Sequence, residues 1–99
     1  MSDLKRRVED VLEGRGELTA ARFLSGEGLF IDGRMVVAVM GEDLCLPVDP
    51  GNWRETLSRP GVGPLLFAGV SVPGWVVVEG TALDGDSALS GWLDYALGT

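Results

Sequence analysis

The pair Asp32-Gly33 separates two apolar runs, residues 29–31 and residues 35–40. A two-residue hairpin turn of type I′ needs positive φ at both central positions, and Asp-Gly is one of the pairs that adopt it most readily. Apolar runs on either side of such a pair are typical of antiparallel strands. The sequence therefore predicts a β-hairpin with Asp32 and Gly33 as its turn, and we interpret Gly26 and Gly28 as turn or bulge residues of the same β-rich segment.

Helical patterns flank this β-rich segment. Apolar residues recur at helical spacing at positions 4, 8, 11 and 12, and again at positions 89, 92, 93, 96 and 97. Ser2 and Gly14 are the expected ends of the first helix, and the last is expected to start at Asp84 or Asp86 and to end at Gly98. Asp49-Pro50 predicts the start of a third, short helix that runs to about Ser58.

The remaining apolar stretches predict about six short strands, at residues 18–24, 28–31, 35–40, 44–48, 65–68 and 75–79. We expect the last two strands to flank a turn that carries Pro73-Gly74, after a break at residues 59–64. Three helices and hairpin-connected strands predict an α+β fold in two layers, in the order α-β-β-β-β-α-β-β-α. The 99 residues are expected to form a single domain over residues 1–99.

The strand from Met35 to Met40 has no polar residue on either face. Strict alternation would place Val36, Ala38 and Met40 on one face and the other three residues on the opposite face. One layer of helices covers only one of these faces. We therefore expect a terminal helix, a second copy of the chain, a protein partner or a bound ligand to cover the other, and a homodimer is our first hypothesis.

Charge and cysteine content limit the function classes. The net charge is −7, and residues 60–99 hold four acids and no base, so we expect no direct binding to nucleic acid. Cys45 is the single cysteine, which excludes an intrachain disulfide and suits a reducing compartment. The N-terminus lacks the apolar core of a signal peptide, and no apolar run is long enough to span a membrane, so a cytoplasmic location is expected.

No catalytic or metal-binding constellation stands out. The chain has no histidine, so an enzyme would depend on carboxylates or on Cys45, which we interpret as a packed strand residue. Asp84-Gly85-Asp86 lacks the further ligands of a calcium loop and is expected to precede the last helix. We expect no cofactor and no metal, and we favour a protein that is not an enzyme.

Three residues are candidates for contact with a ligand or partner. Arg22 lies in an otherwise apolar strand, where its guanidinium must reach solvent, a carboxylate or a ligand. Glu27 is a nearby carboxylate. Trp75 begins a strand, where a partly buried ring can line a groove or an interface.

Several ordered motifs resemble the TfoX (Sxy) N-terminal domain family. Its glycine-rich strand pattern is matched at Arg22, Gly26, Gly28, Phe30, Gly33 and Met35. Residues 43–46, 48–50 and 73–78 are similar to its Asp-Leu-x-Leu, Val-Asp-Pro and Gly-Trp-Val motifs. Pro47 departs from the pattern, because members commonly carry a basic residue at or next to this position.

The resemblance implies a regulatory role, because the founding members of the family regulate competence genes and carry a second domain. We therefore expect a non-catalytic regulatory or protein-interaction module. The alternative is a small-molecule-binding protein or an enzyme with a pocket near Arg22 on the open face of the sheet. A pocket lined by Arg22 and enclosed by apolar side chains would favour the ligand, whereas a flat apolar face would favour the partner.

Overall fold

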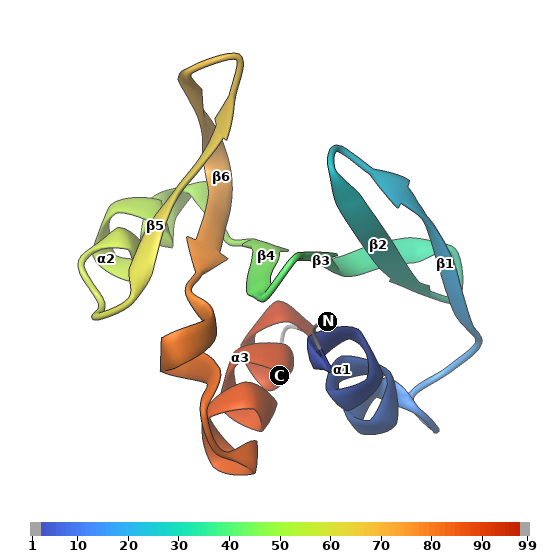
Figure 1. Cartoon of the computed structure of the whole chain (residues 1–99). Helices are drawn as coiled ribbons and strands as arrows, with labels where there is room; N and C mark the ends of the chain where they lie inside the picture. Colours follow the sequence, from blue (N-terminus) through green and yellow to red (C-terminus); the bar gives the residue numbers. More distant parts are fainter. Residues whose placement is uncertain (1–2, 98–99) are drawn as a thin grey trace.

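The computed structural model describes residues 3–97 of the chain (Figure 1). The elements follow the predicted order, and the α+β prediction is confirmed. The expected helix ends at Ser2 and Gly98 lie outside the described residues. The elements are α1 (Leu4–Leu12), β1 (Leu18–Phe23), β2 (Gly26–Ile31), β3 (Arg34–Met40), β4 (Asp43–Pro47), the 3-10 turn η1 (Pro50–Asn52), α2 (Trp53–Leu57), β5 (Val62–Phe67), β6 (Val70–Val78), the 3-10 turn η2 (Gly80–Leu83) and α3 (Asp86–Leu97).

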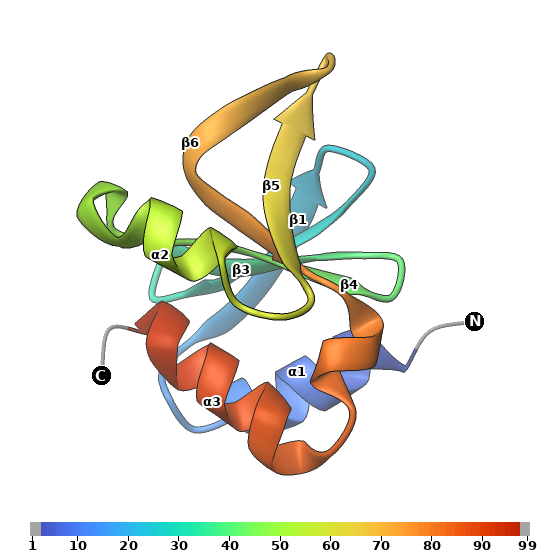
Figure 2. The same cartoon turned by 90° about the vertical axis from the view of Figure 1, so that its left-hand side faces the viewer.

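The six strands form one antiparallel sheet in the order β1-β2-β3-β4-β6-β5. Asp32 and Gly33 connect β2 to β3 with φ values of 53° and 85°, as a type I′ turn requires. The β1–β2 and β5–β6 hairpins both rise on the side of the sheet opposite α1 and α3 (Figure 1). Figure 2 shows that the β5–β6 hairpin projects well beyond the rest of the fold.

The main core lies between the sheet and the helices. The buried faces of α1 and α3 contribute Leu4, Val8, Leu12, Leu89 and Leu93, and these pack with inward side chains of the central strands. The short helical segment begins where Asp49 accepts a hydrogen bond from the Gly51 N–H at 3.0 Å. It continues into α2, which is joined to α3 by a 2.9 Å hydrogen bond between the hydroxyl groups of Thr56 and Tyr95.

The expected alternation along β3 is wrong because the strand contains a bulge. Leu29 pairs with Val37 and Phe30 pairs with Met35, so Val36 is an extra residue without a partner on β2. The bulge turns both Val36 and Val37 toward the helices, together with Val39. Met35, Ala38 and Met40 belong to the opposite face. The helix side of β3 therefore carries three valines, and the other face carries smaller or more flexible side chains.

The predicted turn at Pro73-Gly74 is also wrong. Ala68 and Gly69 make the turn between β5 and β6, with φ values of 52° and 81°. Pro73 and Gly74 lie inside β6, where the register with β5 shifts between Pro64 and Leu66. Proline has no N–H to donate and so disrupts a regular ladder, but it is tolerated where the ladder is already irregular. Both strands are consequently longer than predicted, and the hairpin extends farther from the sheet.

The chain's own hairpins cover part of the second face of the sheet, and no terminal helix within residues 3–97 does so. A second cluster is centred on Ala38, Cys45 and Leu65, all buried. Phe23 of the edge strand β1 and Trp75 of β6 are partly buried and pack against it. The sheet curls, so that Phe23 and Trp75 approach each other with ring centroids 5.5 Å apart, and nothing in the local sequence pattern predicts this curl.

Candidate interaction site between the two hairpins

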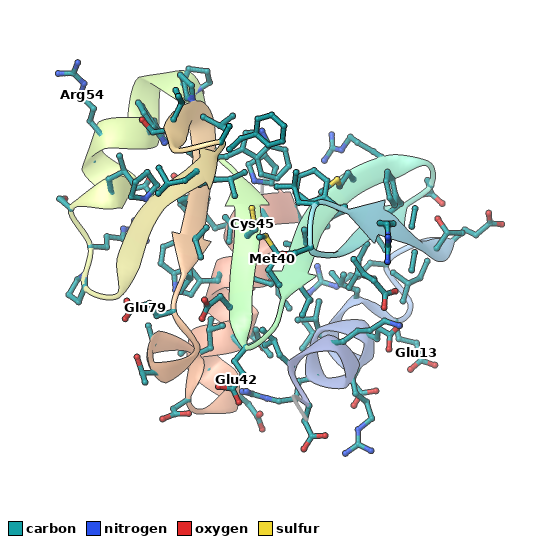
Figure 3. All side chains as sticks on the ribbon, turned by 45° about the horizontal axis from the view of Figure 1, so that its top comes forward. Glu13, Met40, Glu42, Cys45, Arg54 and Glu79 are labelled. Carbon is teal, nitrogen blue, oxygen red and sulfur yellow. The ribbon has the colours of Figure 1, made fainter. Side chains whose placement is uncertain are left out.

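An apolar groove lies between the β1–β2 and β5–β6 hairpins, on the face opposite α1 and α3. We call it the hairpin groove; it has a volume of about 330 Å³ and is lined by Phe23, Leu24, Leu65, Phe67, Val72 and Trp75. Every lining side chain is hydrocarbon or aromatic, and none is charged. Figure 3 looks onto this face: Met40 and Cys45 lie near its middle, while the labelled charged residues lie at the periphery.

The walls of the groove meet through an aromatic stack. The rings of Phe23 and Trp75 have centroids 5.5 Å apart and planes inclined by 23°. Trp75 is further positioned from the helix side, where the indole N–H of Trp53 donates a 2.9 Å hydrogen bond to its carbonyl oxygen. The stack joins the edge strand β1 to β6, which is next to the opposite edge of the sheet, and it holds the two hairpins in contact.

The rims of the groove expose large apolar side chains. Leu66, Phe67 and Val70, at the tip of the β5–β6 hairpin, are 57%, 62% and 67% exposed, and Leu24 on the other hairpin is 41% exposed. Residues 60–78 include no charged residue. We call residues 66–70 the hairpin arm. Apolar side chains grouped at a projecting tip are typical of contact surfaces, in contrast to single apolar residues scattered over a protein surface.

Arg22 and Glu27 lie apart from the hairpin groove. They pair across β1 and β2, and the Glu27 carboxylate lies 3.2 Å from the Lys5 ammonium of α1. Arg22 is exposed, and it lines an open depression of about 490 Å³ with Ala20, Ala21, Ser25, Gly26 and Glu27. Within residues 3–97, the apolar groove is not lined by Arg22, and the depression that Arg22 lines is open. A pocket lined by Arg22 and enclosed by apolar side chains was the arrangement expected for a ligand site. Of the three candidate contact residues, only Trp75 lines the hairpin groove.

Gly26 and Gly28 lie within β2, and the register shift of this strand falls between Leu29 and Phe30, which corrects their interpretation as turn or bulge residues. Leu24 and Ser25 connect β1 to β2. A Cβ atom at Gly26 would collide with the Val39 carbonyl oxygen, and one at Gly28 would lie 3.2 Å from the Met35 side chain. These two glycines therefore permit a close approach of β2 to β3.

Cys45 is fully buried beneath the groove, and burial raises its thiol pKa from 9.0 to about 12. With this pKa the thiol is protonated at neutral pH. Since the thiolate is the nucleophilic form, the buried Cys45 is a poor nucleophile. Within residues 3–97, no three Cys, Asp or Glu side chains are grouped closely enough to hold a metal ion. The same part of the chain contains no helix with the length and apolar character needed to cross a membrane.

The sequence interpretation missed the residues of the hairpin arm. Leu66 and Phe67 were assigned to a short strand with no prediction of their exposure, and Val70 was left in a connection. The signal that could have identified them was the absence of any charge over residues 60–78, since exposed hairpins usually carry charged residues that oppose association.

Comparison with protein families gives a match that covers nearly the whole chain. The family model described as the TfoX N-terminal domain matches residues 10–99. The matched region includes every strand of the sheet and both walls of the hairpin groove. A search among curated proteins found no match.

Proposed function

The chain belongs to the TfoX N-terminal domain family, and from this premise we propose that it is a non-catalytic regulatory module that acts through contact with another protein molecule. The contact surface in this proposal consists of the hairpin groove and the hairpin arm. The observation that carries it is the exposure of Leu66, Phe67 and Val70 next to a groove without charge.

The physical argument is the cost of leaving this surface in water. Each square ångström of apolar surface removed from water contributes about 25 cal/mol. Interfaces are strongest where aromatic side chains fill apolar pockets at the centre of the contact. Phe67 and Trp75 lie at the wall of the hairpin groove and supply such aromatic side chains.

Site-specific cross-linking tests the proposal. Val70→Cys places a thiol on the hairpin arm, and Ser87→Cys places a matched thiol on the exposed first turn of α3. The native Cys45 is buried and protonated, so a thiol-reactive photo-cross-linker attaches at the introduced position. The unsubstituted chain, treated with the same reagent, reports any background reaction.

The labelled proteins are illuminated in an extract of the native host. We expect a protein adduct from position 70 and none from position 87. No protein adduct from position 70, or equal adducts from both positions, would contradict a contact surface on the hairpins.

A further inference from the structure

We propose that the hairpin arm of a second copy of this chain occupies the hairpin groove. In the resulting two-fold symmetric dimer, each copy places its arm against the groove of the other. This inference rests on the proposed function, because it names the partner for the same surface. Each copy supplies both a projecting apolar arm and an apolar groove beside it. A two-fold contact needs such self-complementarity, in which each copy presents the same surface to the other.

The first argument is that the arm is apolar on both of its faces. Phe67 lines the hairpin groove, whereas its neighbour Leu66 points to the opposite side of the ribbon because successive strand residues alternate. Both side chains are more than half exposed. Of these two faces, only the one that carries Phe67 borders the chain's own groove. An arm inserted between the hairpins of a second copy would bury the other face as well.

The second argument is the distribution of charge. Two copies with a net charge of −7 repel each other, and a contact between uncharged surfaces adds the least to that repulsion. Residues 60–78 provide that surface, and the groove lining adds no charged residue. A basic partner, in contrast, would find no acidic side chain in the groove. The surface therefore suits another uncharged apolar surface, and a second copy carries one on its own hairpin arm.

Charge repulsion elsewhere on the two copies predicts an unusual salt dependence. Added salt screens the repulsion between the acidic bodies and leaves the apolar contact intact. The dimer should therefore become tighter as salt is raised from about 50 to about 500 mM. Association through opposite charges would become weaker over the same range.

Sedimentation velocity of the full chain, from about 1 to about 200 μM, tests the inference. We expect the unsubstituted protein to dimerise. Phe67→Glu should raise the dissociation constant of the dimer by about tenfold or more, because it removes an anchoring side chain from the contact. Val70→Glu is a second variant on the same arm and should act in the same way. Ser87→Glu adds the same charge on the exposed first turn of α3 and should leave dimerisation unchanged. Circular dichroism establishes that each variant is folded.

A monomer at the highest concentration, a dimer indifferent to both arm variants, or a dimer that weakens with salt would overturn the inference. The cross-linking experiment separates this failure from failure of the proposed function. An adduct at position 70 with twice the 10.5 kDa chain mass supports a second copy. An adduct of any other protein mass overturns the second copy and retains the interaction surface, whereas no adduct contradicts both.

Discussion

Removal of the Trp75 ring should open the groove and destabilise the fold by an amount that follows from its burial. Truncation of a fully buried tryptophan or phenylalanine to alanine costs about 3–5 kcal/mol. Trp75 is only partly buried, so we expect Trp75→Ala to lower the free energy of unfolding by about 2 kcal/mol. For a domain of this size, such a loss corresponds to a fall in Tm of about 8–16 °C.

Part of the lost free energy comes from the contact between Trp75 and Phe23, because the two rings stack with centroids 5.5 Å apart. A stacked aromatic pair contributes about 0.5–1.5 kcal/mol beyond the area it buries. In a double-mutant cycle, Phe23→Ala and Trp75→Ala should therefore show a coupling free energy of about 1 kcal/mol. Phe30 is a partly buried aromatic residue outside the groove, and Phe30→Ala is the matched control.

Urea denaturation followed by circular dichroism measures the four unfolding free energies of each cycle. We expect coupling between Phe23 and Trp75, and additivity within about 0.5 kcal/mol between Phe30 and Trp75. If the Phe23 and Trp75 effects were simply additive, the two rings would not be stacked in solution. The hairpins would then not close over the second face, and the reasoning that defines the groove would fail.

Four further predictions concern two glycines, the buried cysteine and the net charge. Gly26→Ala should lower the free energy of unfolding by about 1–3 kcal/mol, because the added Cβ would collide with the Val39 carbonyl oxygen. Gly33→Val should lower it by about 1 kcal/mol or more, because Gly33 has a positive φ. Thermal denaturation measures both effects, and an unchanged Tm would contradict the prediction for that variant. Burial raises the pKa of Cys45, so between pH 9.0 and about 12 the folded state keeps the thiol proton that the unfolded state loses. The free energy of unfolding should therefore fall as pH rises through this range, and the fall should be smaller in Cys45→Ala. Equilibrium unfolding at several pH values measures both. The protein alone should not bind duplex DNA at physiological salt, given its net charge of −7, and tight salt-sensitive binding in a gel-shift assay would contradict this.

The parts of the fold that depend on neighbouring residues could be predicted from the sequence. Asp32-Gly33 specifies a turn by its own backbone preferences, and Asp49-Pro50 specifies the start of a helical segment. Helical spacing in α1 and α3 reports the face that each helix buries. These signals lie within a few residues of one another, so the pattern is visible without the tertiary structure.

The bulges could not be predicted, because they depend on how a strand fits its neighbours. Val36 reads as an ordinary strand residue, and only its pairing with β2 shows that it is the extra residue. Pro73-Gly74 has the composition of a turn, yet the longer β5–β6 ladder places it inside a strand. Local preference was overridden by pairing in both cases.

The candidate site was predicted least well because its walls come from distant parts of the chain. Phe23 and Trp75 meet only after the sheet curls, so neither residue predicts the other. Trp75 was identified from its place at the start of an expected strand. Arg22 was singled out as a charge in an apolar strand, but the strand is at the edge of the sheet and the side chain reaches solvent.

The central claim is that the two hairpins form a contact surface for a second copy, and amide chemical shifts measured during dilution test it most directly. As the dimer dissociates, we expect the concentration-dependent shifts to cluster in the hairpin arm and along the hairpin groove, at Leu24, Leu66, Phe67, Val70 and Val72. Amides of α1 and α3 should not change. Shifts confined to the helices, or spectra that are unchanged at every concentration, would contradict the account.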